Sequence, residues 1–188
     1  MIQRTIITIF TLLSLSNVAL AASDNGIAIV NVDKVKMETK AGKSIATQLT
    51  KLQNDLKDKV AKLQKDFYNQ KQDLDKQKNV LSKEAFTKKE TEFNNKVNDS
   101  QKEIQTEANN IEVMQQNSLN EFNNVALGVI ADLAKEGNYL QIFPAEIVIY
   151  SNPKVDITSQ VIAGIDKKVD TIALKTPEDT AKENTKKK

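Results

Sequence analysis

The chain has 188 residues and a formal net charge of +2, from 27 basic and 25 acidic residues, and it contains no cysteine, histidine or tryptophan. Without cysteine and histidine, the usual zinc ligand sets and the Ser/His and Cys/His nucleophile pairs cannot be built. The same composition excludes a disulfide framework and a lipid-attachment cysteine.

The first 21 residues have the pattern of a secretory signal peptide. Arg4 supplies a short positive region, an apolar run extends from Ile6 to Leu15, and Ala19 and Ala21 form a small-x-small cleavage site. The apolar run is too short to span a bilayer. We therefore predict that residues 1–21 direct export and are removed.

Residues 22–42 are predicted to begin a small body. A β-branched run from Ile27 to Val32 follows Gly26 and is typical of a strand that is apolar on both faces. Asp33 to Ala41 is predicted to be a short helix that ends at Gly42, where the chain would turn. Because both faces of the strand need cover, the rest of the body must come from elsewhere.

Residues 43–127 contain neither glycine nor proline, although the chain has five glycines and three prolines outside this stretch. Glycine costs a helix about 1 kcal/mol and proline about 3 kcal/mol relative to alanine, so this exclusion predicts continuous helix. A repeat of 11 residues in the apolar positions predicts a nearly straight or slightly right-handed coiled coil. In the first half these positions are Ile45, Leu49, Leu52, Leu56, Val60, Leu63 and Phe67.

A reversal is predicted near residues 79–83. The apolar stripe loses its regularity there, and Ser82 followed by Glu84 is the order expected of an N-cap serine with an acidic first turn. Two antiparallel arms of about 39 residues would each reach roughly 58 Å. The alternative is one continuous helix in a parallel dimer. Five polar positions are predicted to interrupt the seam and make the arms flexible: Gln70, Lys71, Lys78, Gln115 and Ser118.

Residues 128–172 are predicted to complete the body. After Gly137 and Asn138 end the second arm, the expected elements are two strands, Tyr139 to Phe143 and Glu146 to Tyr150, and a helix from Ile157 to Ile172 capped by Asp156 or Thr158. Residues 173–188 are charged and polar, which predicts a disordered tail.

The predicted fold is therefore α+β and dominated by helix, with a long antiparallel coiled-coil hairpin projecting from a small β body. Such a body is short of core, and its strands would leave exposed edges. We predict that copies of the chain assemble through it. The candidate assembly residues are Ile27, Ile29, Val30, Val32, Val148 and Ile149.

From Gly26 to Val169 the order of these elements resembles the Skp/OmpH family of periplasmic chaperones. The shared features are the leader, the run Ile27 to Val32, the turn Leu81-Ser82-Lys83-Glu84, the segment Ile147 to Tyr150, and Asp156-Ile157-Thr158 at the final helix. The resemblance implies a periplasmic homotrimer whose strands form a central body, with three hairpins around a cavity. Unfolded outer-membrane proteins would be held there without ATP, cofactor, metal or catalytic residue.

Charge divides the arm into two parts. Residues 57–89 hold ten lysines and five acids, whereas residues 90–121 hold two lysines and seven acids. A basic tip would attract acidic client segments or an anionic lipid or lipopolysaccharide surface, and this attraction would weaken with salt. The alternative is an ordinary solvated helix surface. The tip lysines are Lys76, Lys78, Lys83, Lys88 and Lys89.

Four apolar side chains of the arm are candidates for client contact: Phe67, Leu74, Phe86 and Phe93. The alternative is that they only pack the hairpin. For the protein as a whole, the alternative to a chaperone is a structural coiled-coil spacer of the envelope. Export and a near-neutral charge argue against nucleic-acid binding. An enzyme is the least supported class.

Overall fold

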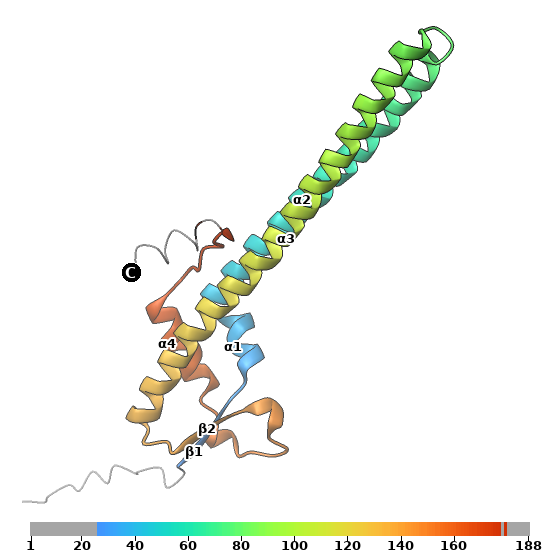
Figure 1. The fold of residues 1–188 in the computed structure, drawn as a ribbon. Helices are drawn as coiled ribbons and strands as arrows, with labels where there is room; N and C mark the ends of the chain where they lie inside the picture. Colours follow the sequence, from blue (N-terminus) through green and yellow to red (C-terminus); the bar gives the residue numbers. More distant parts are fainter. Residues whose placement is uncertain (1–25, 178, 180–188) are drawn as a thin grey trace, which may run out of the picture.

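The computed structural model describes residues 26–177 and 179, so the predicted signal peptide, 1–21, lies outside the described residues. A long helical arm projects from a small body at its lower end (Figure 1). The helix-dominated α+β class predicted from the sequence is confirmed. Within the described ranges, the β part is one two-stranded sheet.

The sheet pairs β1 (Ile27–Val30) with β2 (Gln141–Pro144) in parallel. The register runs from Ile27 opposite Gln141 to Val30 opposite Pro144. On the other side of β1, the carbonyl of Ile29 accepts a hydrogen bond of 3.0 Å from the Ile157 N–H. The central position of β1 explains why three of its four residues are buried.

The strand predicted at Glu146 to Tyr150 is not formed, and this part of the prediction is wrong. A short 3₁₀ helix, η1 (Ala145–Ile147), follows β2, and the Val148 N–H donates to the Ala145 carbonyl at 3.1 Å. A β-branched sequence becomes a strand only where a partner backbone is available, and within the described chain residues 148–150 have none. A second 3₁₀ helix, η2 (Pro153–Val155), leads back toward β1.

The strand predicted to reach Val32 ends two residues earlier, because Asn31 caps helix α1 (Val32–Glu38) with a side-chain hydrogen bond of 2.7 Å. Thr39 then separates α1 from α2 (Lys40–Gln77). The prediction that Gly42 ends a helix is wrong, since it lies in the first turn of α2. Its role is steric, because a Cβ there would lie 1.8 Å from the Lys36 carbonyl oxygen.

The arm consists of α2 and α3 (Lys83–Glu136), which lie side by side and are joined by residues 78–82 (Figure 1). Ser82 Oγ accepts a hydrogen bond of 3.2 Å from the Ala85 N–H, which confirms the predicted N-cap. Contacts between the helices pair Lys59 with Glu103 and Lys96 with Gln70, so the two helices run in opposite directions. The described chain therefore does not form the single continuous helix of the alternative.

The last helix, α4 (Thr158–Lys168), begins where the Asp156 carboxylate accepts a hydrogen bond of 2.8 Å from the Thr158 N–H. It ends four residues before the predicted Ile172. The predicted tail from residue 173 is also structured at its start, because Leu174 packs against the core. The rest of that tail, 178 and 180–188, lies outside the described residues.

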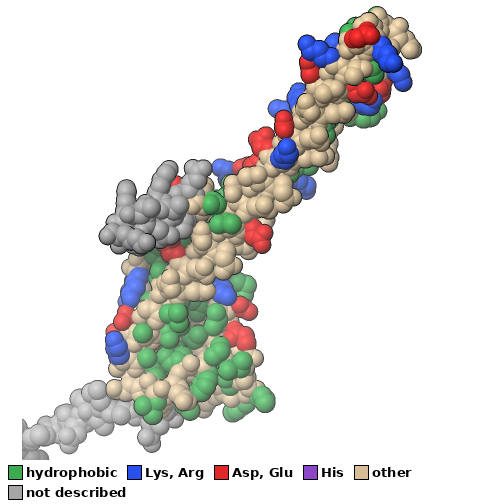
Figure 2. All heavy atoms as spheres, viewed as in Figure 1, with side chains coloured by type: hydrophobic (Ala, Val, Ile, Leu, Met, Phe, Trp, Pro, Cys, Tyr) green, Lys and Arg blue, Asp and Glu red, His purple; other side chains and the backbone are tan. Residues whose placement is uncertain are grey.

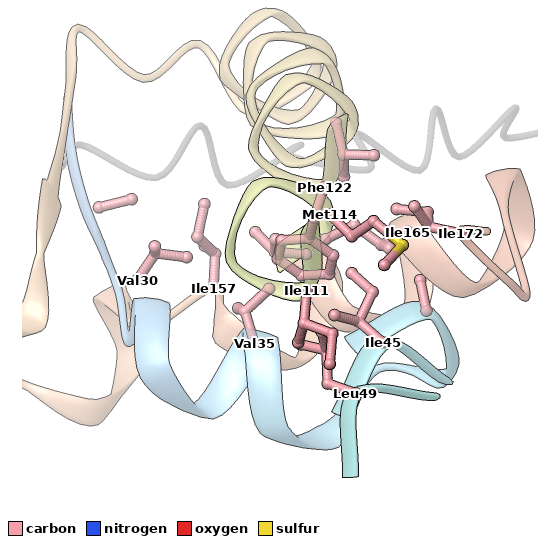
Figure 3. Packing of buried hydrophobic residues seen from close by; sticks show 14 residues of the cluster. Val30, Val35, Ile45, Leu49, Ile111, Met114, Phe122, Ile157, Ile165 and Ile172 are labelled. Atoms are coloured by element: carbon pink, nitrogen blue, oxygen red, sulfur yellow. The ribbon is translucent and has the colours of Figure 1, made fainter. Parts of the chain in front are cut away.

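The hydrophobic core lies where the base of the arm meets the body (Figure 3). There α4 packs closely on α3, since a Cβ at Gly164 would lie 2.5 Å from Val129. Burying one large apolar side chain contributes roughly 1.5–3 kcal/mol, so this cluster fixes the arm base to the body. Its members include Val35, Ile45, Phe122, Ile157, Val161, Ile165 and Ile172.

Candidate functional site

The four candidate client contacts lie in the seam between α2 and α3. The rings of Phe67 and Phe93 meet edge to face, with centroids 6.1 Å apart. Leu74 is buried, and Phe86 is partly buried on the facing helix. The structure thus places all four where they pack the hairpin, and client contact would require the two helices to part or rotate locally.

Most of the arm has a thin apolar seam. Between residues 50 and 110, Leu74 is the only buried side chain of the described helices α2 and α3. Toward the base, Leu49 on α2 and Ile111 and Met114 on α3 join the core. Helices that pack only on each other have few buried neighbours, so the distal arm is held less firmly than its base.

The five polar positions predicted to interrupt the seam do not behave alike. Ser118 lies in it, with 2% of its surface exposed and its hydroxyl donating to the Gln115 carbonyl at 2.9 Å. Gln70 is partly buried and accepts a hydrogen bond of 3.0 Å from Lys96. The remaining three are exposed, so for them the prediction is wrong: Lys71, Lys78 and Gln115.

Polar side chains also cross between the helices. Lys59 Nζ lies 2.8 Å from Glu103 and 2.7 Å from Glu107. Hydrogen bonds to Glu103 and then to Glu107 raise the pKa of Lys59 above its usual value. These polar contacts cross the seam where buried apolar side chains are sparse.

The five tip lysines surround the hairpin turn and are all exposed. Lys76 pairs with Asp73 at 3.0 Å, and Lys89 donates to Gln77 at 2.6 Å. Residues 76–89 hold these five lysines and one acid, Glu84, which is a local charge of +4. The tip is therefore a basic, solvated surface.

A second candidate surface lies on the body, beside the sheet. Ile147, Ile149 and Tyr150 are exposed, Ile149 fully so, around an open hollow of about 1040 Å³ that Ile27 and Phe143 also line. Figure 2 shows hydrophobic side chains gathered over the body, in contrast to the charged and polar surface of the arm. Monomeric proteins rarely expose large contiguous apolar patches without a functional reason.

The six predicted assembly residues divide between this patch and the protein interior. Ile27, Ile29, Val148 and Ile149 line the hollow. Val30 is buried in the chain's own core, and Val32 begins α1. Sequence reasoning did not assign Ile147 or Tyr150 to the surface, although the apolar residues at 147, 149 and 150 were a signal for it.

The described residues contain no group of acidic side chains arranged to hold a metal ion. In the same part of the chain, no helix is both long and apolar enough to cross a membrane.

An arm of two long helices on a small body with one strand pair defines an elongated protein whose candidate surfaces are the arm and an apolar patch. The chain belongs to the OmpH-like outer membrane protein family, whose profile matches residues 26–165. This confirms the resemblance seen in the sequence.

A solved structure has the same fold. It is that of a candidate outer membrane chaperone (OmpH-like) from Caulobacter crescentus CB15, with a TM-score of 0.75 and 19% sequence identity. The match covers 81% of this chain and 90% of the other. At this identity the likeness shows the fold alone. A comparison with curated proteins found no match.

Proposed function

We propose that this protein is an ATP-independent holdase chaperone of the periplasm, which binds unfolded outer-membrane proteins between the helical arms of a homotrimer. Family membership over residues 26–165 supports a chaperone role. The observation that carries the proposal is the arm itself, which extends far from the core and buries only Leu74 between residues 50 and 110. A surface of this kind can adapt to clients of different size without a fixed pocket.

The trimer is proposed to form through the apolar patch on the body. Val148 has an extended backbone, with φ −100° and ψ 118°, and residues 148–150 pair with no strand in the described chain. An exposed strand edge readily pairs with another chain. A neighbouring copy would supply that partner and cover Ile149 and Tyr150. Unfolded outer-membrane proteins and further copies of the chain are thus the proposed partners.

The basic tip is proposed to act before the client is enclosed. Its lysines lie at the far end of the arm, where they would meet acidic client segments or an anionic lipid or lipopolysaccharide surface first. Long-range attraction of this kind raises association rates more than final affinity. Phe67, Leu74, Phe86 and Phe93 would contact the client when the seam opens locally.

The test is a light-scattering assay with purified residues 22–188 and no nucleotide. A urea-denatured outer-membrane β-barrel protein is diluted into buffer with or without the protein. Suppressed scattering is the expected result. Unsuppressed aggregation would favour the structural spacer and refute the holdase.

A shortened arm provides the control. Residues 60–103 can be replaced by a Gly-Ser turn, because Lys59 on α2 lies opposite Glu103 and Glu107 on α3. This variant keeps the core and the body patch, so we expect it to assemble but not to suppress aggregation. If it suppressed aggregation as well as the full protein, the arms would not hold the client.

A further inference from the structure

The segment 169–175, which follows α4, crosses the base of the arm, and we call it the C-terminal strap. It has no regular secondary structure, so contacts with other elements hold it in place. Ile172 is the most deeply inserted residue of the strap, with 1% of its surface exposed, and Figure 3 shows it beside Ile165 within the core. Leu174 packs against the same cluster from its edge.

Polar contacts attach the strap to both helices of the arm. Gln48 on α2 donates to the Ile172 carbonyl at 2.9 Å. Lys175 at the end of the strap lies 3.3 Å from Glu121 on α3. The strap therefore bridges α2 and α3 rather than resting on one of them.

A third polar contact secures the beginning of the strap. Asp170 accepts a hydrogen bond of 2.9 Å from Lys40 Nζ, at the first residue of α2. Hydrogen bonding and then charge attraction from Asp170 raise the pKa of Lys40 above its usual value. The strap is thus attached at both ends and inserted at its middle.

The position of these contacts gives the strap a mechanical role. Gln48 and Glu121 lie within the base of the arm, on the body side of the outermost core residues of α3, Ile111 and Met114. Beyond that level the arm has only its thin seam. A bridge at this level resists separation of α2 from α3 and tilting of both against α4. The match to the family profile ends at residue 165, before the strap begins.

We propose that the C-terminal strap limits how far the arm can swing from the body. With the strap in place, the base of the arm moves with α4, and motion is confined to the distal hairpin. The consequence for clients rests on the proposed function: a restrained arm base limits how far the space between arms can widen, so adaptation to client size falls to the distal hairpin.

The test compares two truncations. One variant lacks 170–188 and therefore loses Ile172 and all three polar contacts. The matched control lacks only 180–188 and keeps the strap and every described residue. In the first variant, hydrogen exchange of backbone amides at 44–56 and 111–122 should accelerate at least tenfold, whereas the control should match the full protein. Unchanged exchange in the strapless variant would overturn the proposal.

A second readout distinguishes a restraint from simple core filling. The chain has no cysteine, so Asn79→Cys places one spin label at the tip of each arm. The distribution of tip-to-tip distances should broaden in the strapless variant and stay narrow in the control. Faster exchange without any broadening would mean that the strap only fills the core, which overturns the proposal. Neither readout uses a client, so failure of client binding would be seen separately. The exchange readout also needs no trimer, whereas the tip-to-tip distance is measured on the assembled protein, whose formation sedimentation checks first.

A milder variant covers the case in which the strapless chain does not fold. Gln48→Ala with Glu121→Gln removes two of the three polar partners of the strap and leaves the Lys40–Asp170 contact and Ile172 in place. Because single hydrogen bonds contribute modestly, we expect exchange at the arm base to rise only about threefold. No change in this folded variant would contradict the proposal.

Discussion

Gly42 offers the sharpest test of how α1 and α2 are joined. A Cβ at this position would lie 1.8 Å from the oxygen and 2.8 Å from the carbon of the Lys36 carbonyl. Both are backbone atoms, so rotation of a side chain cannot relieve the clash in Gly42→Ala. The corner between the two helices must open, which displaces Val35 and Ala41 from the core.

The magnitude follows from two opposing effects. Overpacking of this kind costs roughly 1–3 kcal/mol, and a backbone clash belongs at the upper end of that range. Alanine also recovers about 1 kcal/mol of helix propensity. We therefore expect Gly42→Ala to lower the free energy of unfolding by about 2 kcal/mol.

Gly128→Ala is the matched control, because Gly128 also lies within a helix but a Cβ there would meet no atom within 4 Å. Only helix propensity differs between the variant and the wild type, so Gly128→Ala should raise the free energy of unfolding by about 0.5–1 kcal/mol. The stability of both variants is measured by urea unfolding, monitored by circular dichroism at one fixed protein concentration. The two midpoints should move in opposite directions. A Gly42→Ala protein as stable as the wild type would refute the close approach.

Three further predictions concern assembly, acid stability and capture. Ile149→Asp should dissociate the proposed trimer in sedimentation experiments, whereas Val80→Asp, at another exposed apolar position, in the hairpin turn, should not. A trimer in both variants would exclude the body patch as the assembly surface. Lys168 lowers the pKa of Asp132, so this contact stabilises the fold at neutral pH and is lost as the pH falls through that lowered pKa. Asp132→Asn should therefore lower the urea midpoint at pH 7. At a pH below the pKa of Asp132 in the folded protein, the variant and the wild type should have the same midpoint. An equal loss of stability at both pH values would contradict this. Replacing the tip lysines by glutamine should slow client capture at low ionic strength and matter little near 1 M salt, where the Debye length is about 3 Å. Equal capture rates for the two proteins at low salt would show that the basic tip does not contribute to capture. The lysines to replace are Lys76, Lys78, Lys83, Lys88 and Lys89.

The arm could be predicted from the sequence because its signals are local. The absence of glycine and proline specifies helix, and the cap at Ser82 places the reversal. The 11-residue period placed Leu74 and Phe67 in the seam. It failed for Lys71, Lys78 and Gln115, because the covered positions are their chain neighbours Gln70, Gln77 and Met114, and these three side chains are exposed.

The body could be predicted only in outline, because its details depend on contacts distant in sequence. Gly42 is required by the Lys36 carbonyl and not by a helix end. Residues 146–150 have the composition of a strand but no partner within the described chain. The strap was missed because the sequence pattern assigns residues 169–172 to the last helix and 173–175 to a disordered tail, and only the core reveals that Ile172 and Leu174 are covered without helix.

The candidate client contacts illustrate a limit of another kind. An aromatic residue in a hairpin packs the seam or binds a client, and its spacing is the same in both cases. The edge-to-face contact of Phe67 with Phe93 shows that these rings pack each other in the client-free chain. Under the proposed function, these rings would reach a client only when the distal arm opens, so client contact would depend on arm stability.

The central claim is that the arms are loosely held and that clients bind along them, and hydrogen exchange measured with and without client tests it most directly. In the client-free protein, protection should rise from Ser82 toward Ile45 on α2 and toward Leu133 on α3, because buried neighbours increase in that direction. An unfolded β-barrel protein should raise protection along the distal arm and leave Val30 and Val148 unchanged. Uniformly high protection along both helices without client, or a distal arm that the client does not affect, would contradict the claim and indicate a rigid spacer.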